Sequence, residues 1–198
     1  MRVRTHSALL VLLALAAPAA AQHGHGSPPP TRTAPREASQ FDFLVGQWEI
    51  VAQPRVEGLA ARIHGSPKFP GTWKAWRALD GWGIEDELRL TDESGNPRAF
   101  THCVRMYDPT ARQWKLSLVD VYRSTVLSAT GEWRDDTMHV SSQGTDADGR
   151  AYKTRTRFHD ISANGFRLQQ DRSYDDGHTW IEEFLRIEAK RVSASAPR

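Results

Sequence analysis

Polar and apolar residues alternate with a period of two along most of the chain that follows Trp48. This period is typical of β-strands with one buried and one solvated face, whereas an amphipathic helix repeats roughly every 3.6 residues. Turn-forming sequences such as Asp108-Pro109 and Asn164-Gly165 separate the alternating segments and favour hairpins. The pattern predicts about ten strands, near residues 46–52, 72–79, 82–90, 99–107, 112–122, 125–134, 136–142, 151–160, 165–173 and 179–189.

The segment Phe41–Ile50 precedes this run and organises it. It predicts a short helical turn, then a glycine, then a strand that opens on Trp48. Meandering strands without helical crossovers are expected to close on themselves, because closure removes exposed strand edges. We therefore predict an all-β fold, an antiparallel up-and-down β-barrel of about ten strands, with the helical turn plugging one end. Such a barrel has room for one small ligand.

The more apolar register of each strand is expected to face inward. That register contains Trp48, Ile50, Trp82, Ile84, Leu88, Leu90, Thr101, Cys103, Trp114, Leu116, Leu118, Leu127, Ala129, Trp133, Met138, Val140, Tyr152, Thr154, Phe158, Phe166, Leu168, Trp180 and Phe184. Strands 112–122 and 179–189 also have apolar residues in the opposite register, so either face of these two strands could point inward. The choice between Trp73 and Trp76 is also open.

Charged and polar side chains interrupt the inward register: Asp86, Arg105, Asp120, Gln170, Arg172, Glu182 and Arg186. Unpaired buried charges are costly, so these groups must pair with one another or meet water or a ligand. Aromatic linings with a few convergent polar groups are typical of small-molecule sites. The predicted ligand-binding residues are Asp86, Arg105, Trp114, Asp120, Arg172 and Glu182. A purely structural charge network is the alternative.

Arg105 and Asp120 are expected to form the polar end of the cavity. They lie at different distances from the Asp108-Pro109 turn, so a direct pair between them is not expected. Each charge therefore needs its own partner, which is either a protein side chain or a ligand group.

The N-terminus predicts a secretory signal peptide at 1–21, because Arg2 and Arg4 precede a short apolar run and an Ala-x-Ala site. The apolar run is too short for a membrane span. We expect cleavage after Ala21, a disordered tether at 22–38, one barrel domain at 39–191 and a disordered tail at 192–198. The expected location is periplasmic or secreted.

The charge and the cysteine content bear on two questions, namely whether the protein binds nucleic acid and whether it contains a disulfide. Removal of the leader with its two arginines leaves 24 basic residues against 24 acidic ones, and no basic cluster predicts nucleic-acid binding. The single cysteine, Cys103, cannot form an intrachain disulfide and lies in an apolar strand pattern. Residues 53–70 form a long connection, which is either a lid over the barrel mouth or a surface insertion.

The segment Phe41–Glu49, with Gly46 and Trp48, resembles the Gly-x-Trp opening of the calycin superfamily, which includes lipocalins, fatty-acid-binding proteins and nitrobindin-like haem proteins. More closely, the chain resembles the exported bacterial lipocalin-like DUF1579 family, through Leu79–Gly81, Arg105–Pro109 with Trp114, and Ser173–Trp180. The resemblance implies a calycin or lipocalin-like barrel, and an Arg186 or Arg191 side chain stacked on Trp48.

Ser173–Trp180 also matches the S-x-D-x-G-x-T-W Asp box, a hairpin turn. We predict a structural role for Asp175, Gly177, Thr179 and Trp180, as for Gly46 and Trp48, because the aspartate binds turn backbone groups and the glycine adopts a positive φ.

The predicted function is the binding of a small, partly apolar ligand of unknown identity, without a metal or other cofactor. No nucleophile, phosphate-loop or dinucleotide motif predicts catalysis. One alternative is an enzyme of hydrolase or isomerase type with Asp86, Asp120 or Glu182 as an interior base. Another is nitrobindin-like haem binding, for which only His64 and His178 are placed to reach the mouth. The sequence leaves the oligomeric state open.

Overall fold

The computed structural model describes residues 32–56, 58 and 65–192. The predicted signal peptide, the predicted tether up to residue 31 and the tail from residue 193 lie outside these ranges. Among the described residues, no helix is long and apolar enough to cross a membrane.

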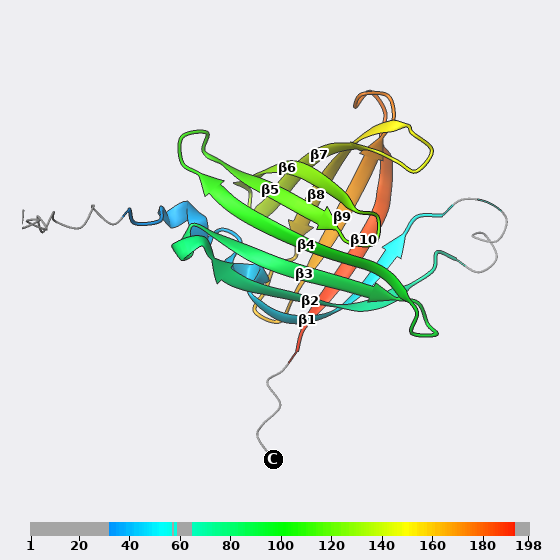
Figure 1. Cartoon of the computed structure of the whole chain (residues 1–198), viewed down its shortest axis with the longest axis horizontal. Coiled ribbons are helices and arrows are strands. Elements are labelled where there is room, and N and C mark those ends of the chain that lie inside the picture. Colours follow the sequence, from blue (N-terminus) through cyan, green and yellow to red (C-terminus); the bar gives the residue numbers. More distant parts are fainter. Residues whose placement is uncertain (1–31, 57, 59–64, 193–198) are drawn as a thin grey trace, which may run out of the picture. The chain divides into compact units, whose positions relative to one another are not determined.

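Ten antiparallel strands form a closed barrel in the order β1-β10-β9-β8-β7-β6-β5-β4-β3-β2 (Figure 1). Strands that are consecutive in the sequence pair with one another, and β1 also pairs with β10, which closes the barrel. The strands are β1 (Gly46–Pro54), β2 (Phe69–Ala78), β3 (Gly83–Thr91), β4 (Pro97–Asp108), β5 (Gln113–Asp120), β6 (Thr125–Arg134), β7 (Thr137–Thr145), β8 (Ala151–His159), β9 (Gly165–Ser173) and β10 (Ile181–Arg191). The predicted all-β, up-and-down barrel is therefore confirmed.

Three short 3-10 helices complete the described secondary structure: η1 (Arg36–Ser39), η2 (Asp42–Leu44) and η3 (Leu79–Gly81). The first two lie at one end of the barrel in Figure 1. Ala38, the last residue of the segment expected as a tether, is 3% exposed and packs in the core. An ion pair from Arg77 to Asp42 ties η2 to the end of β2.

The segment around η2 plugs this end of the barrel, as expected. Phe41 and Leu44 are fully buried. The ring of Phe41 meets that of Trp114 edge-on at a centroid distance of 4.8 Å, and Trp48 Nε1 donates to the Leu44 carbonyl at 2.7 Å. The Arg191 guanidinium lies 4.0 Å above the Trp48 ring, so Arg191, not Arg186, makes the stack that the resemblance left open. We call this region the closed end.

Gly46 allows this closure because its φ is +132°. A Cβ at this position would collide with the Arg191 guanidinium, which donates from Nη1 to the Val45 carbonyl at 3.0 Å. The glycine therefore serves both the backbone conformation and the close approach of the arginine.

The structure resolves the open registers. Trp73 points inward and is 3% exposed, whereas Trp76 is 39% exposed. In β5, Leu116 and Leu118 take the inward register, as expected, and Val119 is exposed.

In β10 the inward side chains are Leu185, Ile187 and Ala189, so this strand takes the second of the two registers that the sequence left open. The pairing of β10 with β9 is irregular between Ile181 and Leu185, where Glu183 has a φ of +52°. Ile181 pairs with Arg172 and Leu185 with Gln170, so β10 has two extra residues here and keeps the same inward register on both sides of the irregularity.

Candidate functional site

The closed end holds a buried ion pair between two neighbouring strands. Arg105 Nε on β4 donates to Asp86 Oδ2 on β3 at 2.6 Å, and the two side chains are 5% and 3% exposed. Trp73 Nε1 donates to the other carboxylate oxygen at 2.8 Å. The Arg105 guanidinium also lies 4.8 Å from the centre of the Phe41 ring. Asp86 therefore supplies the partner of Arg105 that the sequence left open.

Burial alone would lower the pKa of Arg105, but the Asp86 carboxylate opposes it and the pKa of Arg105 is raised above its usual value. The arginine is thus held in its charged form inside the plug. Trp114 belongs to the same packed region: it is fully buried, and its Nε1 donates to Gln40 Oε1 at 3.0 Å. Three of the predicted ligand-binding residues, Asp86, Arg105 and Trp114, therefore have protein partners at the closed end.

Asp120 lies at the other end of β5. Its carboxylate binds Arg123 Nη1 at 2.6 Å and accepts the Arg123 backbone N–H at 3.1 Å, within the turn that leads to β6. As expected, it does not pair with Arg105. A turn-stabilising role accounts for both contacts.

The inward placement of Glu182, Arg186 and Trp180 is wrong. The Glu182 side chain is 74% exposed and that of Arg186 is 50% exposed. Trp180 packs against the guanidinium of Arg155 on the outer face, at 4.5 Å from its ring centre. Glu182 and Arg186 lie in the register of β10 opposite to that of Ile181, Leu185 and Ile187, which pair with Arg172, Gln170 and Leu168.

Beyond the plug, the inward-facing side chains of one wall of the barrel remain accessible. Leucines and one alanine line this apolar wall and are only half-buried: Leu88 and Leu90 on β3, Leu118 on β5, and Leu127 and Ala129 on β6. A side chain that points into a closed barrel meets solvent only through the barrel's interior or its mouth. We call the half of the barrel away from the plug, where these inward side chains are only partly buried, the open half.

The facing strands β7, β8 and β9 give the open half a polar wall. Ser142 and Thr154 share a hydroxyl–hydroxyl hydrogen bond of 2.6 Å, and Gln170 Nε2 donates to Thr156 Oγ1 at 3.2 Å. Cross-strand pairing places Thr156 opposite Gln170 and Thr154 opposite Arg172, so all four side chains share the inward face. The interior of the open half thus has one apolar and one polar side.

Arg172 stands at the outer end of the polar wall. Its guanidinium lies over the rings of Tyr152 and Phe184, at 4.1 and 3.9 Å from the ring centres. Its hydrogen bond within the described chain runs from Nη1 to Tyr174 Oη and is long, at 3.4 Å. Within that part of the chain, no carboxylate lies within ion-pair distance of Arg172, and its buried Nε has no hydrogen-bond partner.

A hollow of about 590 Å³ lies beside two aromatic neighbours of Arg172. It lies at the tips of the β7–β8 and β9–β10 hairpins, and its lining includes Gly144, Tyr152 and Tyr174. Two of these residues touch Arg172. Of the predicted ligand-binding residues, Arg172 is therefore the one that combines an accessible position with an unpaired charge. Its aromatic neighbour Tyr174 was missed from the sequence, although its spacing of two from Arg172 places it on the same face.

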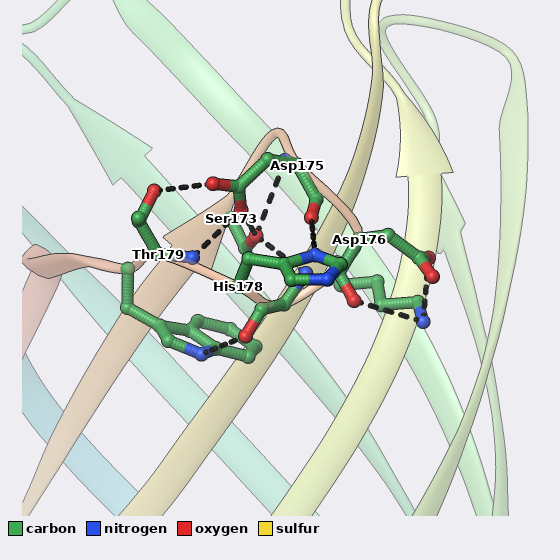
Figure 2. Close-up of polar contacts among 8 residues, drawn as sticks. Ser173, Asp175, Asp176, His178 and Thr179 are labelled. Carbon is green, nitrogen blue, oxygen red and sulfur yellow. Dashed lines mark hydrogen bonds and ion pairs between the residues drawn. The ribbon is translucent and has the colours of Figure 1, made fainter.

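The Asp box adopts the predicted hairpin turn (Figure 2). Asp175 accepts hydrogen bonds from the Thr179 hydroxyl at 2.6 Å, the Thr179 backbone N–H at 2.8 Å and the Ser173 hydroxyl at 2.8 Å. Trp180 Nε1 closes the turn on the Gly177 carbonyl at 3.0 Å. The hydrogen bonds from Thr179, and then that from Ser173, hold the pKa of Asp175 well below its usual range. These contacts are those of a structural turn.

Sequence reasoning missed a second buried carboxylate, Asp171, on the outer face of β9. It is 1% exposed, binds Arg155 Nε at 2.7 Å and accepts the backbone N–H of Glu183 at 2.9 Å. Burial raises its pKa, but hydrogen bonds from Gln169, Glu183 and Arg155 outweigh this and lower it. Asp171 thus holds the irregular part of β10. The sequence signal for this pair was that Arg155 and Asp171 have opposite charges and lie at matching distances from the turn between β8 and β9.

The histidines relevant to haem binding lie as expected where they are described. His102, His139 and His159 take the outward register of their strands. His178 lies in the Asp-box turn, where Nδ1 is 2.6 Å from the Asp175 carbonyl oxygen. His64 lies outside the described residues.

A comparison with protein families finds no match, and a comparison with curated proteins finds none either. Among solved structures, the chain is similar to the S-type phycobiliprotein lyase CPES from Guillardia theta, with a TM-score of 0.52 and 13% identity over 78% of this chain and 92% of that chain. At this identity the likeness is one of fold alone. It agrees with the closed ten-strand barrel and its N-terminal helical turn, so the protein has a lipocalin-like fold.

Proposed function

We propose that this chain is an exported protein of the DUF1579 type that binds a small, partly apolar molecule inside the open half of its barrel. The observation that carries the proposal is the contrast between the two halves. At the closed end the inward side chains are buried and partnered, whereas in the open half the inward leucines are half-buried. Exposed apolar surface in a concave interior is what an apolar ligand covers.

The interior carboxylates give less support to catalysis. Asp86 is bound by Arg105 and Trp73, Asp120 is bound by Arg123, and Glu182 is exposed on the outer face. A general base needs a carboxylate within reach of a substrate proton. Ligand binding without a proton-transfer role for these three groups is therefore the better-supported function.

Titration with the neutral dye phenylnaphthylamine, whose fluorescence rises in apolar surroundings, tests the proposal. We expect saturable binding to the purified barrel. Ala129→Phe should block dye binding, because Ala129 is a small inward side chain of the apolar wall. The larger phenylalanine ring would occupy the barrel interior that faces this position.

Thr130→Phe is the matched control, because Thr130 follows Ala129 in β6 and its side chain points outward and is exposed. It should leave dye binding unchanged. Absence of dye binding, or equal loss in both variants, would contradict a site in the open half. Thermal unfolding of both variants distinguishes a blocked cavity from a damaged barrel.

A further inference from the structure

We infer that Arg172 is the recognition site for an oxyanion, and that the molecule bound in the open half is an amphiphile with a carboxylate or similar head group and an apolar body. This inference rests on the proposed function and names the chemical class of its ligand.

The first observation is the uncompensated charge of Arg172. Other arginines on nearby strands have carboxylate partners: Arg105 binds Asp86 at 2.6 Å, and Arg155 binds Asp171 at 2.7 Å. Arg172 is only partly exposed, yet no carboxylate of the described chain lies within ion-pair distance of it. Removing a cation from water without a counter-charge is unfavourable, so a ligand that supplies a negative charge is stabilised there.

The second observation is the orientation of the guanidinium. The guanidinium lies over the rings of Tyr152 and Phe184, at 4.1 and 3.9 Å from the ring centres. An arginine carries its five N–H donors in the plane of the group, so donors remain for a ligand while the rings hold the group in place. The long Nη1–Tyr174 contact of 3.4 Å uses one of these donors. A held guanidinium with free edge donors matches the geometry of a carboxylate.

The third observation is the division of the interior into two walls. Arg172 continues the polar wall of Thr154, Thr156 and Gln170, whereas strands β3, β5 and β6 present leucines. In the closed strand order, β9 stands across the barrel from these strands. A molecule with its head group at Arg172 would therefore lay its body against the apolar wall. The hollow at the hairpin tips is lined by Tyr152 and Tyr174, which contact Arg172, and also by Asp175 and Asp176.

Two dyes that differ in one group test the inference. Phenylnaphthylamine is neutral, and anilinonaphthalene sulfonate has the same rings with an added sulfonate. In Arg172→Met, which keeps an unbranched apolar stem but removes the charge, we expect the sulfonated dye to bind at least about tenfold more weakly, equivalent to about 1.4 kcal/mol. The affinity of the neutral dye should change by no more than about twofold.

Arg172→Lys should restore part of the affinity for the sulfonated dye, because it restores the charge without the planar donors. Arg157→Met, which removes an exposed arginine on the outer face of β8, should leave both affinities unchanged. Ala129→Phe should remove binding of both dyes, which locates them in the open half. Thermal unfolding of Arg172→Met checks that the barrel remains folded.

The outcomes separate this inference from the proposed function. If the neutral dye binds but Arg172→Met lowers the affinity for both dyes equally, or for neither, the assignment of the oxyanion site is wrong. The proposal of a ligand-binding barrel is unaffected by that result. Failure of the sulfonated dye to bind the unaltered protein, with the neutral dye bound, has the same meaning. If neither dye binds, the proposed function fails and this inference fails with it.

Discussion

Arg105→Met should be among the most destabilising single changes in this protein. It removes the guanidinium from Asp86, whose carboxylate is 3% exposed, and leaves Trp73 Nε1 at 2.8 Å as the remaining side-chain donor. Breaking a buried ion pair in this way costs about 3–5 kcal/mol, chiefly because one charge is left buried without its partner. The stack of Arg105 on Phe41 is lost as well. Against a total stability of about 5–15 kcal/mol for a typical domain, the loss is large.

Urea unfolding followed by tryptophan fluorescence measures the effect, since several tryptophans lie near the plug. Arg157→Met is the control: this arginine is exposed on the outer face, so its replacement should change the free energy of unfolding by no more than about 0.5 kcal/mol.

The double variant Asp86→Asn/Arg105→Met removes the stranded charge and keeps an acceptor for Trp73. It should recover about 1–3 kcal/mol relative to Arg105→Met alone. A loss below about 1 kcal/mol for Arg105→Met, or no coupling between the two positions, would refute the structural role of the pair. That outcome would return Arg105 to the candidates for ligand binding.

Other changes probe the plug, the Asp box and the thiol. Trp48→Ala empties a site that is 1% exposed and should cost about 3–5 kcal/mol, and a midpoint shift no larger than that of a surface variant would disprove the plug. Gly177→Val forces valine into a φ of +97° and should cost about 1–3 kcal/mol without affecting dye binding. The hydrogen bonds to Asp175 lower its pKa, so their stabilising contribution is complete above the ordinary aspartate pKa and is lost as the pH falls through the folded value. Asp175→Ala should therefore lower the unfolding midpoint at neutral pH and flatten the acid limb, and an unchanged acid limb would contradict this. Burial raises the pKa of Cys103 to about 11, so at pH 8 a thiol reagent should react with it roughly a hundredfold more slowly before unfolding than after, and equal rates would show an accessible thiolate.

The sequence by itself determined the elements whose causes are local. Alternation with a period of two depends only on neighbouring residues, and it predicted all ten strands, with boundaries close to those observed. The helical turn before Gly46 and the hairpin from Ser173 to Trp180 likewise follow from residues a few positions apart. Closure into a barrel also followed, because ten meandering strands would otherwise leave two exposed edges.

The tertiary structure decided which charges are compensated. Asp86 and Arg105 lie on the paired strands β3 and β4, and their contact requires the register of these strands together with the position of Trp73 on β2. Composition showed equal numbers of acids and bases along the inward register but not which of them meet. No carboxylate of the described chain lies within ion-pair distance of Arg172, and Glu182, one of the acids predicted to face inward, is 74% exposed.

The tertiary structure also determined which face of β10 points into the barrel. The irregular pairing between Ile181 and Leu185 depends on the Glu183 backbone N–H, which donates to the buried Asp171 on the neighbouring strand at 2.9 Å. An alternation pattern carries no record of such a bond, and apolar residues occupy both registers of this strand, so its pairing with β9 decided which side chains point inward. Local sequence thus determined the strands and the plug, whereas non-local pairing determined the faces, the charge partners and the position of the open half.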